Sequence, residues 1–230
     1  MSSPSVSSAP GVEAQEPPDQ RYLSLLVSLL SLLVIYPFVE RLGRGSLIFG
    51  LFYTLIVINV IYSLSDRRRF FWVLLGLAVP ATLLHWGGTV SGSENLRAAG
   101  AIISTLMLGY TAALILQDVL RAEKVTGQKV CGAICVYLIF GLIWADLYTW
   151  LAAVDPAAFS GAVSEDVPFS EMLYFSFVTL TTLGYGDFSP AGDVGRTLAV
   201  VEALLGQLYL VTVIAVLVGS LGRTALRPGH

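Results

Sequence analysis

Residues 181–187 read Thr-Thr-Leu-Gly-Tyr-Gly-Asp, and their backbone oxygens could coordinate a dehydrated cation. Gly184 and Gly186 flank Tyr185, and glycine adopts positive φ at little cost. Backbone that alternates in this way can turn consecutive carbonyl oxygens to one side, where a ring of them replaces the water shell of a cation. The Thr182 hydroxyl would add the innermost oxygens. We therefore predict an ion selectivity filter that is completed by four copies of the chain.

The neighbouring sequence decides between this interpretation and a simple turn. Gly184-Tyr185-Gly186 alone would more often be a surface turn. Here, however, a segment of helical length from Ser170 to Leu180 precedes the string, and a long apolar run follows it. A pore helix, a filter and a membrane span in this order are what a pore-loop channel requires.

The string resembles the potassium-channel signature, with Leu183 in place of the commoner valine. The resemblance implies a filter made by Thr182, Leu183, Gly184, Tyr185 and Gly186. It places K⁺ ions, the permeant ligand, at the first four of these residues. It also places Asp187 at the outer mouth of the pore.

The preceding segment is similar to the pore helices of two-pore-domain and small bacterial potassium channels over Tyr-Phe-Ser-Phe-Val-Thr at 174–179. Tyr174, Phe175 and Thr181 are expected to support the filter, with Phe177 completing an aromatic cuff. Many voltage-gated channels have tryptophans at the places of Tyr174 and Phe175. One of these donates a hydrogen bond to the aspartate after the filter, which Phe175 cannot do.

Composition points to a membrane protein. Of 230 residues, 55% are hydrophobic and 13% are charged, and the mean hydropathy is +0.76. The charged share is about half that of a soluble domain. The apolar composition makes membrane lipid the expected surrounding. A net charge of −3 does not favour nucleic-acid binding.

We predict an all-α membrane protein with six transmembrane helices and a re-entrant pore helix and filter between the fifth and the sixth. Each span is close to the roughly 20 residues needed to cross the hydrocarbon core. The spans are expected at 22–39, 46–64, 70–86, 98–117, 130–151 and 198–221. The segment between the last two contains Asp155, Pro156 and Glu165, and such broken backbone at membrane depth must line a water path or lie within protein.

Four regions follow from these spans. We expect a disordered tail at 1–20 without a signal peptide, and a four-helix membrane domain at 21–120. A pore domain at 128–224 and a short cytoplasmic tail at 225–230 complete the chain. Most of the 13 Lys and Arg residues face the cytoplasm if both termini lie inside, which favours a multi-pass protein of the plasma membrane, or of the inner membrane in a bacterium.

Local signals predict how the pore helix and the last span are placed. Ser170 is the expected N-cap of the pore helix, and Glu171 in its first turn would complement the positive helix end. In the last span, Gly206 is interpreted either as a hinge or as a site of close helix packing. If Gly206 faces the cavity, helical spacing brings the following residues towards the axis: Gln207, Leu210 and Ile214.

Glu202 is an ionisable residue within the last span, which makes it a functional candidate. Two interpretations stay open. The carboxyl group is hydrogen-bonded behind the pore helix, or it takes part in gating.

The fourth span lacks the positive residues that a voltage sensor requires at every third place, since 98–117 contains no Lys or Arg. The first four helices are therefore voltage-sensor-like in position only. One pore loop per chain implies a homotetramer. No cofactor, cytoplasmic ligand-binding domain or enzymatic motif is expected. The alternatives are a non-selective or sodium-permeable cation channel and, with less support, a potassium transporter subunit, which would need internal repeats.

Overall fold

The computed structural model describes residues 21–40, 45–63, 68–121, 126–155, 157–160 and 168–225. The tail expected at 1–20 and nearly all of that expected at 225–230 lie outside these ranges. The described elements are α1 (Arg21–Val39), α2 (Gly45–Ser63), α3 (Arg68–Ser91), α4 (Glu94–Leu120), α5 (Gly127–Val154), β1 (Phe159–Ser160), α6 (Phe169–Leu180), β2 (Ser189–Pro190) and α7 (Asp193–Ala225).

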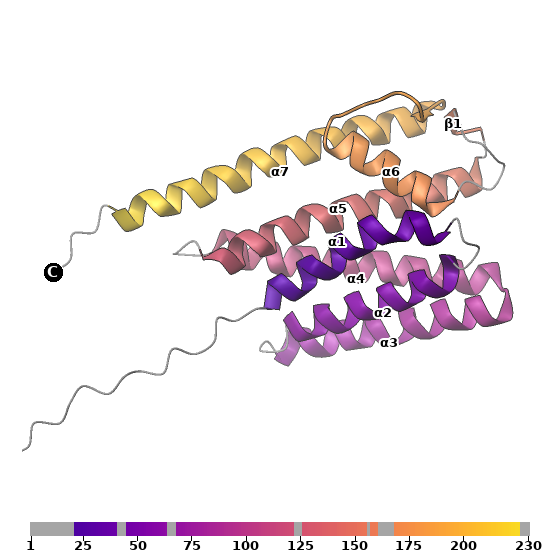
Figure 1. Ribbon diagram of the computed structural model, residues 1–230, viewed down its shortest axis with the longest axis horizontal. Coiled ribbons are helices and arrows are strands. Elements are labelled where there is room, and N and C mark those ends of the chain that lie inside the picture. The colour runs from indigo at the N-terminus through magenta and orange to yellow at the C-terminus, as the bar shows by residue number, and fades with distance from the viewer. Residues whose placement is uncertain are drawn as a thin grey trace, which may run out of the picture.

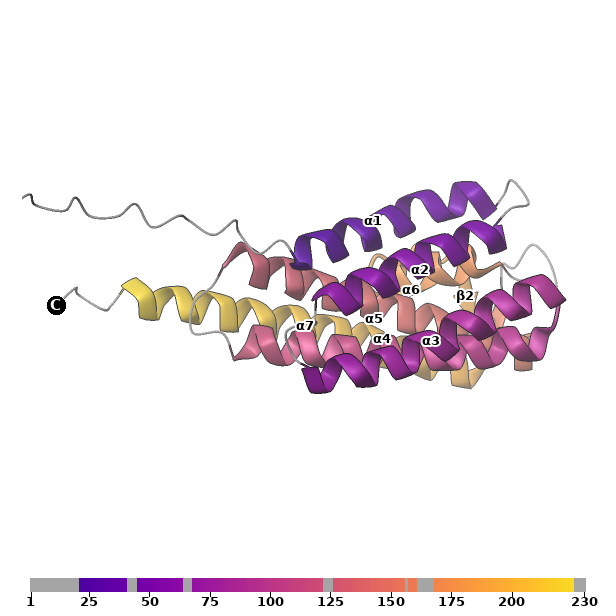
Figure 2. The same cartoon turned by 90° about the horizontal axis from the view of Figure 1, so that it is seen from below.

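The long helices lie side by side, and the short helix α6 lies near one end of them. Figures 1 and 2 show α1 to α5 and α7 running along the long axis of the molecule. The end of α1 and the beginning of α7 lie at the same end of the bundle as α6, whereas α1 begins and α7 ends at the opposite end (Figure 1). The pore-helix candidate is thus held among the other helices and does not run their length.

Five helices are long and apolar enough to cross a membrane within the described residues: α1, α3, α4, α5 and α7. Helix α2 contributes a shorter apolar segment, Gly50–Tyr62. The predicted all-α fold is therefore observed, and the length and composition of these helices support a multi-pass membrane protein. The count of six spans stays a prediction.

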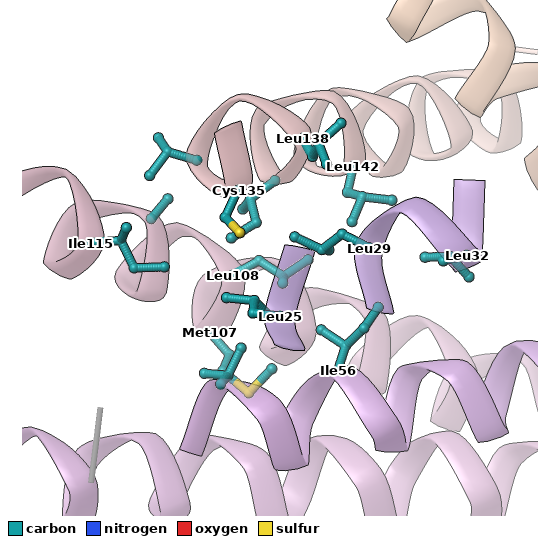
Figure 3. Packing of buried hydrophobic residues seen from close by; sticks show 14 of the residues in the cluster. Leu25, Leu29, Leu32, Ile56, Met107, Leu108, Ile115, Cys135, Leu138 and Leu142 are labelled. Carbon is teal, nitrogen blue, oxygen red and sulfur yellow. The ribbon is translucent and has the colours of Figure 1, made fainter. Parts of the chain in front are cut away.

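Buried apolar side chains join α1, α2, α4 and α5 into one core (Figure 3). Leu25, Leu29 and Leu32 recur at helical spacing along one face of α1 and are at most 3% exposed. They meet Ile56 of α2 and Met107 of α4 in this cluster. In lipid this contact is stabilised by close packing more than by the hydrophobic effect, since the surroundings of the bundle are also apolar.

Polar contacts tie three helices together at the end of the bundle distant from α6. Asp118 of α4 forms an ion pair with Lys129 of α5. The hydroxyl of Tyr22 in α1 donates to Asp118 Oδ2 at 2.8 Å, and the Tyr22 N–H donates to Gln128 Oε1 at 3.0 Å. Contacts between residues about 100 positions apart fix α1 to the pair formed by α4 and α5.

Candidate ion-conducting site

Helix α6 begins at Phe169, and its N-cap lies two residues before the predicted one. The N-cap is Pro168, in extended conformation and without a side-chain cap, so the assignment of Ser170 was wrong. Proline fixes its own φ near the extended value found here, which lets the helix start at Phe169. Glu171 lies in the first turn, as predicted. The N–H of Ser170 donates to Glu40 Oε2 at 3.2 Å, and Glu40 is the residue that directly follows α1.

The backbone after α6 alternates between ordinary and left-handed conformations. Positive φ values occur at Thr182 (60°), Gly184 (56°) and Gly186 (78°), with Leu183 and Tyr185 between them. Glycine allows this conformation, as the sequence indicated, but a β-branched threonine adopts it only at a cost in strain. Such strain persists where the surrounding structure holds it, and it is concentrated at functional sites.

Carbonyl groups at the end of α6 hold the first part of this strained segment. The N–H of Thr182 donates to the Thr179 carbonyl at 2.9 Å, and the N–H of Leu183 donates to the Val178 carbonyl, also at 2.9 Å. The Thr182 hydroxyl donates to the Thr181 carbonyl at 2.7 Å. The position of the filter candidate therefore depends directly on that of α6.

Asp187 is fixed by a donor that the sequence analysis did not identify. The Tyr174 hydroxyl donates to Asp187 Oδ2 at 2.8 Å, and the N–H of Phe188 donates to Oδ1 at 3.0 Å. The hydrogen bond from Tyr174 is the main cause that holds the pKa of Asp187 below its ordinary value. Phe175 indeed has no donor, but the phenol one position earlier supplies it.

Phe175 belongs to an aromatic cluster behind the filter candidate. Its ring lies 4.8 Å from that of Tyr148 in α5 and 5.5 Å from that of Phe159 in β1. Phe188, just after the filter, stacks on Phe159 at 5.2 Å. The pairing of β1 with β2 brings Phe159 opposite Pro190, so the segments before α6 and after the filter are joined. No periodic pattern in the sequence could have indicated these partners.

Gly206 lies against the last residue of α6. A Cβ atom at this position would be 2.7 Å from the Leu180 carbonyl oxygen and 2.8 Å from Leu180 Cδ1. The same carbonyl accepts a hydrogen bond from the Tyr137 hydroxyl at 3.1 Å. Close packing, one of the two interpretations of Gly206, is therefore present, and Gly206 faces the pore helix. A hinge role stays a prediction.

The predicted cavity residues of α7 have a different orientation. Gln207, Leu210 and Ile214 are exposed in the single chain, where the Gly206 face is covered. Their place along a pore axis requires further copies of the chain and also stays a prediction.

Glu202 lies one turn before Gly206 and is fully buried. Its Oε2 accepts from the Tyr148 hydroxyl at 2.6 Å, and its Oε1 lies 2.6 Å from the Ser176 hydroxyl. The Ser176 oxygen is also 2.8 Å from the Gly141 carbonyl. The Ser176 hydroxyl is the donor in both of its contacts, the one to Glu202 Oε1 and the one to the Gly141 carbonyl. The carboxyl is thus hydrogen-bonded behind the pore helix, and a gating role stays a prediction.

The ligands that this site offers to a cation are oxygen atoms of the filter candidate. Among the described residues, no group of three or more His, Cys, Asp and Glu is placed to hold a metal ion. Residues 181–187 are all exposed in the single chain. Carbonyl and hydroxyl oxygens suit hard monovalent or divalent cations, in contrast to the nitrogen and sulfur ligands of zinc.

Comparison with known proteins places the same part of the chain in a family. Residues 132–222, which include α6 and the filter candidate, match a family model described as an ion channel. "Probable potassium channel protein 2" of Methanocaldococcus jannaschii is 46% identical over 57 residues, which are 24% of this chain and 17% of that protein. The chain thus matches only a small part of that relative.

Two shorter relatives match over most of their length. Protein LctB of Geobacillus stearothermophilus is 29% identical and Protein LctB of Bacillus caldotenax is 30% identical, each over 112 residues. These residues make up 46% of this chain and 83% of each relative. No solved structure matches the chain.

Proposed function

The chain belongs to the potassium-channel family, and from this premise we propose that it conducts K⁺ selectively and passively through a pore formed by four copies. It is an ion channel and a multi-pass membrane protein. Thr182, Leu183, Gly184, Tyr185 and Gly186 supply the oxygens, and Asp187 attracts cations to the outer entry.

The alternation of φ is the observation that carries the proposal. Left-handed residues at Thr182, Gly184 and Gly186 occur at every second position, within the Thr-Leu-Gly-Tyr-Gly string. Three amide donors at the start of the string, those of Thr182, Leu183 and Gly184, are turned towards α6. This leaves carbonyl oxygens as the groups available to an ion, which is the ligand type of a potassium filter.

Ion selectivity can be measured on the purified protein in planar bilayers with unequal KCl and NaCl. We expect the reversal potential to shift by about 59 mV for each tenfold change in the ratio of K⁺ concentrations, which is the value for an ion of one elementary charge. Gly76→Ala is the matched control for Gly186→Ala, because Gly76 is distant from the filter and a Cβ atom there meets nothing within 4 Å. We expect selectivity to be kept in the first variant and lost in the second. A wild-type reversal potential that follows Na⁺ as closely as K⁺ would instead indicate a non-selective cation channel.

The surface of α7 supports assembly from several copies. One stripe of α7, formed by Glu202, Gly206, Tyr209 and Val213, is buried against the chain. Another stripe is 57–67% exposed and entirely apolar, and consists of Val200, Leu204, Leu208 and Val211. One pore loop cannot enclose an axis, so this face is available to neighbouring copies around a closed ring.

The number of copies can be determined by light scattering of the solubilised channel. We expect a protein mass of about four times 24.7 kDa after subtraction of the detergent. A stable monomer or dimer that retains channel activity would contradict the tetramer.

We expect opening to depend only weakly on voltage. In α4, Arg97 lies in the first turn and no Lys or Arg occurs in the rest of the helix. Each elementary charge that crosses the field contributes about 2.3 kcal/mol per 100 mV, so a helix without such charges is driven little by the potential. Single-channel recording over a wide range of potentials measures this. A steep activation curve equivalent to several charges per channel would show that the first four helices do sense voltage.

A further inference from the structure

The N-cap residue of α6, Pro168, makes no side-chain hydrogen bond to the start of the helix. The first N–H groups of a helix have no partner within the helix and need acceptors from elsewhere. Pro168 offers no side-chain cap. Glu171 lies in the first turn, but within the described part of the chain its Oε2 has no hydrogen-bond partner. Among the described residues, the carboxylate of Glu40 reaches this helix end and accepts from the Ser170 N–H at 3.2 Å, across 130 positions of sequence.

Glu40 is itself held in place by α1. The Tyr36 hydroxyl donates to Glu40 Oε1 at 2.6 Å, from one helical turn earlier. Tyr36 is only 4% exposed, and its ring meets that of Phe169 edge-on at 5.8 Å. One oxygen of Glu40 is therefore fixed by α1, and the other binds α6. The ring that orients Glu40 also contacts the first residue of α6.

The charge of Glu40 suits this position. The N-terminus of a helix carries partial positive charge, and a carboxylate near it is stabilising. A hydrogen bond from an amide to a carboxylate is also stronger than one between neutral groups. The contact thus joins α1 to α6 by electrostatics, by a hydrogen bond and by aromatic packing at one place.

We propose that Glu40 is a positioning residue of the selectivity filter, through which the first helix sets the place of the pore helix. Helix α6 has 12 residues and is about 18 Å long. Its far end supplies the Val178 and Thr179 carbonyls that hold Leu183 and Thr182. A displacement of the Ser170 end is therefore transmitted to the filter by a short, rigid helix. This gives the first four helices a route to conduction that needs no voltage-sensing charge, and it rests on the proposed potassium conduction.

Three variants of the full chain separate the parts of this contact. Glu40→Gln removes the charge but keeps an acceptor oxygen, Glu40→Ala removes both, and Tyr36→Phe removes only the hydroxyl that orients Glu40. Asp193→Asn is the matched control, because it neutralises an exposed carboxylate in the first turn of α7 at the same end of the bundle.

Hydrogen exchange at the start of α6 tests the contact between Glu40 and Ser170 independently of any measurement of channel current. We expect the Ser170 amide to exchange about tenfold faster in Glu40→Ala, equivalent to about 1.4 kcal/mol, and by a smaller factor in Glu40→Gln and Tyr36→Phe. Exchange in Asp193→Asn should equal that of the wild type. Because Tyr36 acts through Glu40, the double variant Tyr36→Phe/Glu40→Ala should exchange no faster than Glu40→Ala. Unchanged exchange in all Glu40 variants would overturn the proposal.

Single-channel recording with K⁺ and Rb⁺ tests the consequence for the filter. We expect severalfold shorter openings and an altered Rb⁺/K⁺ permeability ratio in Glu40→Gln and Tyr36→Phe, with neither change in Asp193→Asn. A permeability ratio reports filter geometry, which a loss of overall stability alone would not change. If the wild type conducts K⁺ and these variants match it, the positioning role is wrong while the proposed function stands. If the wild type carries no K⁺-selective current, the proposed function is wrong, and the exchange experiment still decides the contact.

Discussion

Gly206→Ala distinguishes close packing from a hinge at this position of α7. The added Cβ atom would lie 2.7 Å from the Leu180 carbonyl oxygen, whereas ordinary van der Waals contact begins at 3.4 Å. Helices α6 and α7 would therefore have to separate by about 0.7 Å, the difference between these distances. The Leu180 carbonyl cannot turn aside freely, because it belongs to α6 and accepts a hydrogen bond from Tyr137.

The magnitude follows from two opposed effects. Overpacking of a close contact costs about 1–3 kcal/mol, and replacement of a mid-helix glycine by alanine contributes up to about 1 kcal/mol in the favourable direction. We expect a net destabilisation of about 1–2 kcal/mol, since the obstacle is backbone and not the end of a flexible side chain. For a chain of this size, such a loss lowers the midpoint of thermal unfolding by about 2–8 °C.

Thermal unfolding of the detergent-solubilised channel is the assay, with Gly76→Ala as control. A Cβ atom at Gly76 meets nothing within 4 Å, so the same substitution should leave the midpoint unchanged or raise it slightly. Because Leu180 directly precedes Thr181, we also expect Gly206→Ala to change the Rb⁺/K⁺ permeability ratio. If Gly206→Ala is as stable as Gly76→Ala and only opens less often, the packing argument is refuted and the hinge interpretation is supported.

Two further predictions concern carboxyl groups near the filter. Tyr174→Phe removes the hydrogen bond that lowers the pKa of Asp187, so this pKa should rise towards its ordinary value near 3.9. A lowered pKa keeps Asp187 charged until the external pH falls through that pKa. In Tyr174→Phe the pKa is higher, so the loss of current in external acid should begin at a higher pH than in the wild type. Equal pH profiles of the current in the two proteins would contradict this. Glu202→Gln keeps the shape of the buried side chain and its contacts with Tyr148 and Ser176, so its thermal stability should be close to that of the wild type. Glu202→Ala leaves both hydroxyl groups without this partner and opens a cavity, which should cost about 2–4 kcal/mol, and equal stability of the two variants would argue against the hydrogen-bonded arrangement.

The sequence by itself determined the features that depend on neighbouring residues. The apolar runs indicated the long helices, because a span must be continuous and apolar to cross a membrane. Gly184 and Gly186 indicated left-handed backbone, and positive φ is found at both. Glu171 was correctly placed in the first turn of α6, since charge at a helix end is a local property.

Only the tertiary structure decided which distant residues support these elements. Glu40 contacts α6 across 130 positions, and Tyr148 contacts Glu202 across 54. The packing face of Gly206 likewise depends on where α6 lies. Such pairs leave no periodic signal in the chain, because a helix presents the same spacing to lipid, to a neighbouring helix and to a pore. The direction in which each face points is set by the packing of all helices together. This packing brings the Glu40 carboxylate to the N-terminus of the pore helix, where the sequence had predicted a cap by the Ser170 side chain.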